Sequence, residues 1–372
     1  MLVGASIENP NYPASGIPEL VQRLRASIAD EGGWLPFDRF MATALYEPGL
    51  GYYANSGRKF GAMPSSGSDF VTAPELTPLF GRALARQLGP ALAACGGDEI
   101  FEFGAGSGAL AEQLIAALGP ALRRYSIVDV SGSLRERQRT RLAAHGDRVR
   151  WLDAWPAVMN GVVIANELLD AMPVKLLHWD GARWHERGVA TQADAFAWAD
   201  RPTTLRPPLE TGFVPGTTIE IHPQAEAFVA SLAEHLQRGA AFFIDYGFPE
   251  AEYYHPQRTG GTLMCHRAHL ADADPLVAVG LKDITAHVNF SGIALAGQNA
   301  GLEVIGYTSQ ARFLLNCGLL DLVPGAAPRD LAAVQKLLGE HEMGELFKVL
   351  GFAKGCDVDA IGFAEGDRTH RL

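Results

Sequence analysis

Apolar side chains recur at intervals of three and four residues near the start of the chain, from Leu20 to Ile28 after Pro18, and again from Phe37 to Leu45 after Pro36. This spacing predicts two amphipathic helices. Residues 47–76 are dense in glycine, proline and serine, but they also carry several tyrosine and phenylalanine side chains. A solvated linker rarely contains so many aromatic residues, so this segment is predicted to be an ordered loop that folds over a functional site.

From about residue 98 the pattern changes to short apolar blocks that alternate with helical periodicity. Such alternation predicts an α/β fold in which a parallel, doubly wound sheet is covered by helices on both faces. A β-hairpin is predicted at 174–190, and a helix is predicted to open at Pro223 and to close at Gly239. The tail adds a helix at 328–338. The predicted strands are 99–103, 125–128, 149–152, 162–165, 241–244, 302–307 and 346–353.

The composition narrows the class of protein. Hydrophobic residues make up 48% of the 372 residues, which is sufficient for a folded core. The net charge is −11, since 31 Lys and Arg stand against 42 Asp and Glu, so sequence-independent binding to nucleic acid is not expected. The sequence shows no secretory signal, no apolar run of membrane-spanning length and no CxxC pair. We expect a cytoplasmic protein without membrane insertion.

A glycine-rich turn joins the strand at 99–103 to the next helix. Gly104, Gly106 and Gly108 follow this strand directly, where unusual dihedral angles are needed and a ligand can approach a backbone that lacks Cβ atoms. Asp129 ends the next strand, 25 residues after the first glycine (129 − 104 = 25). An acid at this place accepts hydrogen bonds from a ribose diol. The turn is therefore predicted to bind a nucleoside, although a tight turn without a ligand also explains the glycines.

The spacing of the glycines distinguishes between nucleoside cofactors. A dinucleotide site has the pattern GxGxxG, with a helix N-terminus facing a pyrophosphate, whereas this turn has GxGxG followed by Ala109. Glu102, two residues before the first glycine, repels a phosphate but suits an ammonium group. S-adenosylmethionine carries an α-amino group, a sulfonium and a ribose but no phosphate. The motif therefore favours S-adenosylmethionine over NAD or FAD.

Several longer motifs resemble those of one family of enzymes. The chain resembles the class I S-adenosylmethionine-dependent methyltransferases and, more narrowly, the MidA family of mitochondrial complex I assembly protein arginine methyltransferases and their bacterial relatives. The resemblance implies a Rossmann-like core with a seven-stranded sheet, binding of S-adenosylmethionine, and methylation of an arginine in a partner protein such as a respiratory-complex subunit. The similar segments are GYY (51–53), SDFVTAPEL (68–76), FEFGAGSGAL (101–110), YSIVDVSGSLRERQ (125–138), NELLDAMPV (166–174), DYG (245–247), DITAHVNF (283–290) and MGELFKVL (343–350).

An organisation along the chain is also predicted. An N-terminal helical segment with a cofactor-covering loop is expected at 1–80, and the cofactor-binding core at 81–249, interrupted by a β-hairpin insertion at 174–200. An insertion at 250–300 is expected to form a cap on the substrate side. The end of the core is expected at 301–372.

Position by position, the resemblance assigns residues to the cofactor. Two departures from the family pattern stand out: Asp129 replaces the glutamate of many relatives, and Asn289 occupies a position where an acid is common. The shorter acid is chemically equivalent, whereas a charge-based role at position 289 is in doubt. The implied cofactor contacts are the loop glycines Gly104, Gly106 and Gly108, the ribose acid Asp129, Asp153 beside the adenine, Asn166 next to the methyl group, and Thr72, Pro74 and Glu75 in the closing loop.

Two acids directly after the strand at 162–165 are candidates for the methyl-accepting side. A guanidinium is protonated in water and needs carboxylates that orient it and take up a proton as it reacts. Glu167 and Asp170 are three residues apart, so in a helical turn they share a face. They also suit a structural role, in which they cap the following helix or hold the loop. His287 is a further candidate as a general base or orienting group, and its alternative role is that of a buried, hydrogen-bonded histidine.

Alternatives of other classes remain open. A chain with the same motifs could bind the cofactor without catalysis and act as an assembly factor that holds a partner through its insertion and N-terminal helices. A weaker alternative is an NAD-dependent oxidoreductase. No metal site is predicted, because the spacing of Cys265, His255, His266 and His269 fits no usual ligand pattern. The sequence leaves the oligomeric state open.

Overall fold

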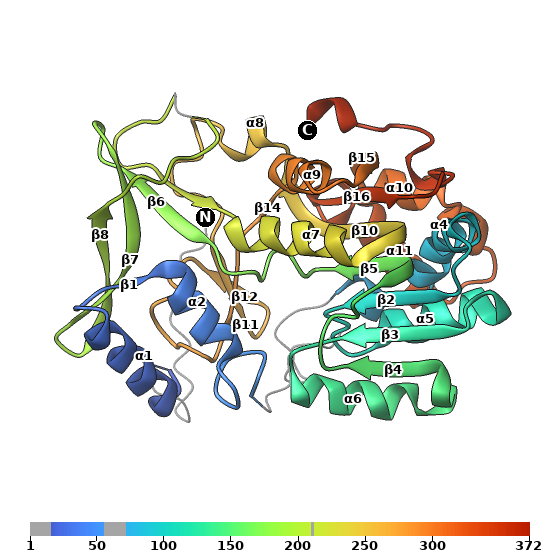
Figure 1. Ribbon diagram of the computed structural model, residues 1–372, viewed down its shortest axis with the longest axis horizontal. Helices are drawn as coiled ribbons and strands as arrows, with labels where there is room; N and C mark the ends of the chain where they lie inside the picture. The colour runs from blue at the N-terminus through green and yellow to red at the C-terminus, as the bar shows by residue number, and fades with distance from the viewer. Residues whose placement is uncertain (1–15, 56–71, 210–211) are drawn as a thin grey trace. The chain divides into compact units, whose positions relative to one another are not determined.

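The computed structural model describes residues 16–55, 72–209 and 212–372 (Figure 1). The part of the predicted cofactor-covering loop at 56–71 lies outside the described residues. Contacts divide the chain into two compact units of three segments each, whereas the ranges expected from the sequence follow the chain in order. The first unit contains Met1–Arg58, Pro173–Ile221 and Pro256–Ala286, and the second contains Lys59–Met172, His222–His255 and His287–Leu372.

The second unit is built on a mixed sheet. Its strands lie in the order β15-β16-β10-β5-β2-β3-β4, and β14 pairs with β10 as an additional strand. The strands from β10 to β4 are parallel, and Figure 1 shows them one below the other, whereas β16 runs antiparallel to both of its neighbours. The strands are β2 (Glu99–Phe103), β3 (Arg124–Val128), β4 (Val149–Leu152), β5 (Met159–Asn166), β10 (Leu236–Phe248), β14 (Val288–Asn289), β15 (Glu303–Ser309) and β16 (Phe347–Lys354).

The predicted α/β fold is therefore present, but the detail of a single seven-stranded sheet is not. In the described chain this sheet has eight strands, because the two residues of β14 pair with the part of β10 that extends beyond β5. Two further sheets of five and three strands belong to the first unit. Blocks of apolar residues predict the strands, but they do not predict how segments far apart in the sequence pair.

Helices cover both faces of this sheet. Phe242 and Ile244 of β10 belong to one core, and Phe243 between them belongs to the other, since successive side chains of a strand point to opposite faces. Residues of α4 and α5 contribute to the first core, and residues of α7 and α9 to the second. The α-helices are α3 (Ala73–Leu76), α4 (Leu79–Cys95), α5 (Ala109–Leu118), α6 (Gly132–Leu142), α7 (Pro223–His235), α8 (Glu250–Tyr253), α9 (Phe290–Asn299), α10 (Gln310–Asn316), α11 (Pro328–Leu338) and α12 (Met343–Leu346). The 3-10 helices are η2 (Gly119–Ala121), η3 (Ala143–Arg148), η4 (Leu319–Leu322), η5 (Ile361–Phe363) and η6 (Thr369–Arg371).

One predicted boundary in this unit is wrong. The helix expected to close at Gly239 ends at His235, and β10 begins directly at Leu236. Leu236 continues the helical spacing of the apolar residues before it, but it pairs with Met159 of β5 instead. Tertiary pairing with the neighbouring strand therefore overrides the local helical pattern.

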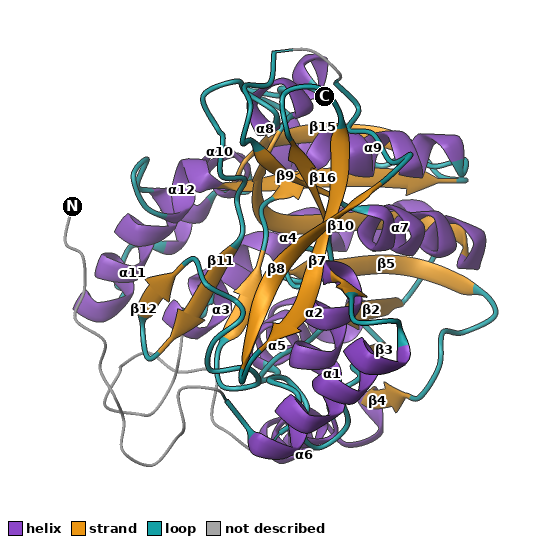
Figure 2. Cartoon of the chain, turned by 90° about the vertical axis from the view of Figure 1, so that its left-hand side faces the viewer, coloured by secondary structure: helices purple, strands orange, loops and turns teal. Residues whose placement is uncertain are grey.

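The first unit consists of antiparallel strands and two helices. Its five-stranded sheet has the order β1-β7-β6-β9, with β8 on the free side of β7, and Figure 2 shows β7 and β8 running side by side. The other sheet has the order β12-β11-β13. The elements are α1 (Pro18–Asp30), β1 (Leu35–Pro36), α2 (Phe37–Tyr46), β6 (Lys175–Trp179), β7 (Trp184–Gln192), β8 (Ala195–Pro202), β9 (Thr218–Ile221), β11 (Met264–Arg267), β12 (Leu270–Asp272) and β13 (Asp283–Thr285).

Side chains from distant segments connect the elements of this first unit. Lys175 at the start of β6 lies 3.1 Å from Asp38 of α2 and 2.8 Å from Glu186 of β7. Glu220 of β9 is buried, and its Oε1 accepts hydrogen bonds from the backbone N–H groups of Thr262 and Leu263 at 2.8 and 2.9 Å. These contacts hold the predicted hairpin region against the N-terminal helices and the 256–286 segment. Across the described residues of the whole chain, no helix is long and apolar enough to span a membrane.

Candidate functional site

The glycine loop lies between β2 and α5 at the carboxyl edge of the parallel strands. Gly104, Gly106 and Gly108 have φ values of 70°, 54° and 81°, the left-handed region that favours glycine. The Gly104 N–H donates to the carbonyl of Val128 at 3.0 Å. A Cβ atom on Gly104 would lie 2.8 Å from Cδ1 of Leu168. Leu168 belongs to the turn after β5, so the glycine loop and this turn are in close contact.

The segment with the sequence TAPE lies against the glycine loop. Oε1 of Glu75 accepts hydrogen bonds from the hydroxyl of Ser107 and, at 2.9 Å, from Nη1 of Arg141 on α6. Thr72 is the N-cap residue of α3, and the carbonyl of Pro74 accepts a hydrogen bond from Gln113 of α5 at 2.7 Å. Pro74 and Glu75 are therefore held by the side chains of Ser107 in the glycine loop, Gln113 of α5 and Arg141 of α6.

Asp129 lies at the tip of β3, where it is almost fully buried. Its Oδ1 accepts from the N–H of Ser131 at 2.9 Å, and its Oδ2 accepts from Nε2 of Gln138 at 2.7 Å. Burial raises the pKa of Asp129, while these two hydrogen bonds lower it. Each carboxylate oxygen retains a further acceptor position for a ligand. The ribose-binding role of Asp129 stays a prediction.

Gln138 links three elements around the loop. This residue of α6 is fully buried. Its Nε2 donates to the carbonyl of Gly106 at 3.0 Å as well as to Asp129, and its Oε1 accepts from the indole N–H of Trp151 on β4 at 3.0 Å. Gln138 was not singled out from the sequence, although it ends the similar segment YSIVDVSGSLRERQ. A glutamine in an arginine-rich helix gives no sign of burial.

Glu102 lies on β2, 2% exposed, just before the glycine loop. The hydroxyl of Tyr125 on β3 donates to its Oε2 at 2.8 Å. Burial raises the pKa of Glu102 to about 8, helped by the nearby charge of Asp129 and opposed by the Tyr125 hydrogen bond. A carboxyl in such surroundings is mostly neutral at pH 7, and a cation placed beside it favours the ionised form.

Asp153 follows β4 and is exposed, in contrast to the other predicted cofactor residues. Its side chain is 89% exposed, and its Oδ1 lies 2.7 Å from Nη1 of Arg135 on α6. The adenine contact of Asp153 stays a prediction.

Asn289 has a structural role, because its Oδ1 accepts a hydrogen bond from the backbone N–H of Gly292 at 3.3 Å and so caps the N-terminus of α9.

The turn after β5 carries Asn166, Glu167 and Asp170, and one buried carboxylate holds it in place. Oδ2 of Asp245 on β10 accepts from the backbone N–H groups of Leu168, Leu169 and Asp170 at 3.1, 2.9 and 3.3 Å. Burial and the nearby charges of Asp170 and Glu167 raise the pKa of Asp245 well above its ordinary value. Glu167 has a φ of 54°, which is strained for a residue with a side chain.

Two acceptor oxygens of this turn are buried without a hydrogen-bond partner in the described residues. They are Oδ1 of Asn166 and Oδ1 of Asp170, and their residues are 9% and 6% exposed. Nδ2 of Asn166 donates to Oε1 of Glu167 at 2.9 Å, which fixes which atom of the amide is the acceptor. Buried polar atoms of this kind are rare in folded proteins. Both oxygens require donors, so the turn suits a ligand that carries N–H groups.

Asp170 also connects the turn to the third predicted catalytic residue. The hydroxyl of Tyr246 on β10 donates to its Oδ2 at 2.5 Å, and the Tyr246 ring meets the ring of His287 edge-on, with centroids 5.1 Å apart. The ring of Phe248 contacts His287 in the same way, also at 5.1 Å. Burial raises the pKa of Asp170 to about 6, and the hydrogen bond from Tyr246 opposes this shift. His287 is half-buried. Tyr246 connects it to Asp170, because the Tyr246 ring contacts His287 and the Tyr246 hydroxyl binds Asp170.

All of the predicted site residues lie in the second unit. Asp153 differs from the others because its side chain is 89% exposed. Sequence reasoning missed five residues that hold the others in place, although Asp245 and Tyr246 belong to the similar segment DYG. These five are Ser107, Gln138, Arg141, Asp245 and Tyr246.

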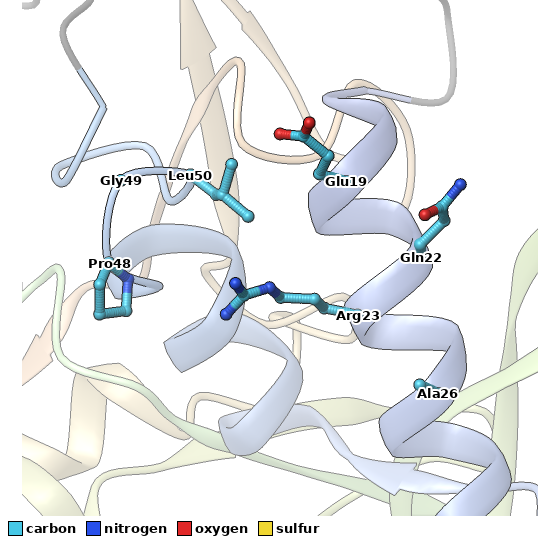
Figure 3. Close-up of a pocket in the computed structure, with 7 residues that line it drawn as sticks. All are labelled: Glu19, Gln22, Arg23, Ala26, Pro48, Gly49 and Leu50. Atoms are coloured by element: carbon cyan, nitrogen blue, oxygen red, sulfur yellow. The ribbon is translucent and has the colours of Figure 1, made fainter.

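One hollow on the surface of the first unit is lined by none of the predicted site residues. This hollow of about 510 Å³ lies between α1 and the loop that follows α2 (Figure 3). Glu19, Arg23 and Leu50 are among its lining residues. Within residues 16–55, 72–209 and 212–372, no group of three or more His, Cys, Asp or Glu side chains is placed to hold a metal ion.

The chain is similar to solved structures over nearly all of its length. A family model described as "Putative S-adenosyl-L-methionine-dependent methyltransferase" matches residues 83–308. A crystal structure of a Burkholderia thailandensis protein bound to S-adenosyl-homocysteine is 50% identical, covers 97% of this chain and 100% of its own, and superposes with a TM-score of 0.91. A native structure from the same organism is 48% identical over 97% of this chain and 100% of its own, with a TM-score of 0.87.

Similar proteins with assigned names are more distant. The mitochondrial protein arginine methyltransferase NDUFAF7 of Danio rerio is 26% identical over 90% of this chain and 87% of its own length. The Homo sapiens protein of the same name is 25% identical over 92% of this chain and 86% of its own length.

Proposed function

Because the chain belongs to this family of S-adenosyl-L-methionine-dependent methyltransferases, we propose that it methylates an arginine side chain of a partner protein. S-adenosylmethionine is the cofactor and supplies an electrophilic methyl group. The names of the curated relatives support arginine as the acceptor. A respiratory-complex subunit as the partner, and a cytoplasmic location, are carried from the sequence as further parts of this proposal.

One observation carries the proposal: buried acceptor oxygens lie on the turn next to the glycine loop. Oδ1 of Asn166 and Oδ1 of Asp170 have no donor among the described residues, and Leu168 of the same turn packs against Gly104. A guanidinium presents five N–H donors in one plane. Such a group satisfies several acceptors at once, whereas a hydroxyl or thiol acceptor offers a single hydrogen.

The strained backbone at Glu167 supports a functional role for the same turn. A residue with a side chain at φ 54° costs about 1 kcal/mol or more relative to an ordinary conformation. The carboxylate of Asp245 holds the turn in this form through three backbone hydrogen bonds. Strain of this kind persists where the surrounding structure fixes it, and it is most frequent at functional sites.

The acids of the turn have two tasks in this reaction. As the nitrogen of the acceptor forms its bond to the methyl carbon, the bond from that carbon to sulfur breaks, and the nitrogen must lose a proton. A carboxylate that accepts an N–H hydrogen bond aligns the nitrogen before the reaction and takes up the proton afterwards. Asp170 suits both tasks, since a pKa of about 6 leaves it mostly ionised at pH 7. Glu167 adds negative charge that favours a cationic acceptor.

Transfer of labelled methyl groups tests the proposal directly. The purified chain is incubated with tritiated S-adenosylmethionine and the protein fraction of a lysate from cells that lack the gene. We expect label in one or a few proteins and methyl-arginine in their digests by mass spectrometry. Glu167→Gln and Asp170→Asn, which preserve size and remove charge, are expected to lose transfer while they still bind S-adenosyl-homocysteine in calorimetry.

Three outcomes of this experiment contradict the proposal in different ways. Label on a residue other than arginine, or on a small molecule, excludes arginine as the acceptor. Binding of S-adenosyl-homocysteine without transfer to any component supports the cofactor-binding assembly factor instead. Full activity of both variants removes the turn from the reaction. The family match gives the NAD-dependent alternative no support.

A further inference from the structure

We propose that Tyr246 is a positioning residue for methyl transfer: its hydroxyl binds one carboxylate oxygen of Asp170 and so directs the other oxygen to an N–H group of the methyl acceptor. This inference rests on the proposed function, because it assigns the acceptor-facing atom of Asp170. Tyr246 itself is not proposed to touch the acceptor.

The two oxygens of Asp170 have different surroundings. Oδ2 accepts the hydrogen bond from the Tyr246 hydroxyl at 2.5 Å. Oδ1 is buried and has no partner in the described part of the chain. A carboxylate that rotates freely presents either oxygen, whereas one held by a donor at Oδ2 presents Oδ1. The hydrogen bond from Tyr246, together with the backbone N–H groups of Asp170 and Ala171 that also stabilise the carboxylate, therefore favours Oδ1 as the available atom.

Tyr246 and the turn that carries Asp170 are held by the same carboxylate. Oδ1 of Asp245 accepts from the backbone N–H of Tyr246 at 3.0 Å, while its Oδ2 accepts from the N–H groups of the turn. The ring of Tyr246 is also fixed, because the rings of His287 and Phe347 meet it edge-on at centroid distances of 5.1 and 5.3 Å. The donor is thus placed by the backbone and by two aromatic contacts.

Asp170 lies among other acidic side chains, so the neutral hydroxyl of Tyr246 matters as a donor that favours its ionised form. Glu167 lies on the same turn and Asp245 on β10, and both are acids. His287, in the segment before β14, contacts the ring of Tyr246, whose hydroxyl binds Asp170. Lys348 of β16 is the register partner of Asp245, but its Nζ donates to the carbonyl of Glu345. Among side chains, Tyr246 is the group whose hydrogen bond lowers the pKa of Asp170 against its burial.

A purely structural role for the Tyr246–Asp170 contact predicts different behaviour. If the hydrogen bond only joins β10 to the turn, its loss reduces activity equally at every pH, because fewer molecules are correctly folded. If it positions an acceptor oxygen and favours its ionised form, its loss shifts the pH at which Asp170 titrates. The pH profile therefore separates the two roles.

The test compares two tyrosine-to-phenylalanine variants in the same unit. Tyr246→Phe removes the hydroxyl that binds Asp170. Tyr307→Phe on β15 is the matched control, because Tyr307 is fully buried and its hydroxyl has no partner among the described residues. Binding of S-adenosyl-homocysteine verifies that each variant is folded.

The first readout needs no methyl acceptor. The protein is labelled with 13C at the aspartate carboxyl carbon, and the signal of Asp170 is assigned by its absence in Asp170→Asn. In the wild type this carboxyl is expected to titrate near pH 6. In Tyr246→Phe the midpoint is expected to rise by about one pH unit, and in Tyr307→Phe to stay unchanged.

The second readout is the rate of label transfer to the lysate protein fraction between pH 5.5 and 8.5. The acidic limb of the profile is expected to shift upward in Tyr246→Phe, with about a fivefold loss of rate at pH 6 that recovers largely at pH 8. Asp170→Asn provides a second variant, in which the limb is expected to be lost.

An unmoved midpoint and a uniform loss of rate in Tyr246→Phe overturn the inference and leave the proposed function intact. A wild-type protein that transfers no label to arginine overturns the proposed function, and the inference with it.

Discussion

Cofactor binding is predicted to depend on pH, because the carboxyl of Glu102 is buried on β2. Its pKa is raised to about 8 in the ligand-free protein, since burial disfavours the charged form. A ligand ammonium beside it favours the ionised form, so binding requires loss of the proton. Glu102 is expected to lie next to the α-amino group of the cofactor, as the sequence predicts. Affinity then increases with pH as long as free Glu102 is protonated.

The magnitude follows from the pKa. At pH 7 about one in ten Glu102 side chains is ionised in the ligand-free protein, and at pH 6 about one in a hundred. The dissociation constant of S-adenosyl-homocysteine is therefore expected to fall about tenfold from pH 6 to pH 7, with release of about 0.9 proton per ligand at pH 7. The range stays below pH 7.5 because an α-amino group itself loses its proton near pH 8.

Calorimetry in two buffers of different ionisation enthalpy measures both quantities. Methylthioadenosine, which has the nucleoside and the sulfur but no α-amino group, provides the control ligand and is expected to bind without this pH dependence. Glu102→Gln is expected to bind S-adenosyl-homocysteine more weakly at pH 7, with no dependence on pH. The same flat profile for both ligands with the wild-type protein would refute the placement of Glu102 at the ammonium group.

The other predictions concern the glycine loop and its neighbours. Gln138→Leu removes three buried hydrogen bonds and is expected to lower the free energy of unfolding by about 4 kcal/mol in urea, whereas the exposed Gln335→Leu on α11 is expected to change it by about 0.5 kcal/mol or less. Gly104→Val places a branched side chain at φ 70° and against Leu168, so a folded variant with unchanged affinity for S-adenosyl-homocysteine contradicts the loop assignment. Asp153→Ala removes an exposed ion pair and is expected to leave thermal stability nearly unchanged. A tenfold or larger loss of S-adenosyl-homocysteine affinity in this variant supports the adenine contact, and unchanged affinity rejects it.

The sequence predicts the elements of the second unit well, because each has a local signature. The predicted strand 149–152 and helix 328–338 have the bounds of β4 and α11. The glycines of the loop all adopt the positive φ values that their clustering after β2 suggests. In each case the apolar spacing or the glycine itself determines the local conformation.

What the sequence does not predict depends on contacts between distant segments. Leu236 continues a helical pattern, but pairing with β5 makes it the first residue of β10. Gln138 reads as one polar residue on an exposed helix, and its burial follows from the packing of α6 on the glycine loop and β4. The contact between Tyr246 and Asp170 joins positions 76 residues apart. No spacing in the chain indicates it.

The five-stranded sheet of the first unit also depends on contacts that the sequence does not predict. The elements of this unit come from three stretches of sequence, and β1 pairs with β7 across more than 150 positions. A hairpin signal at 174–190 predicts the pairing of β6 with β7, since that contact is local. It contains no information about which other segments complete the sheet.

The interleaving of the two units has a consequence for synthesis on the ribosome. Residues up to Ala286 must leave the exit tunnel before the first unit has all its segments, and the second unit needs the C-terminal residue as well. Neither unit can therefore be completed before most of the chain has been made, and the second unit is completed last. Expression of either one as an uninterrupted fragment will omit part of its sheet or include part of its neighbour, so the intact polypeptide is the smallest piece from which both emerge whole.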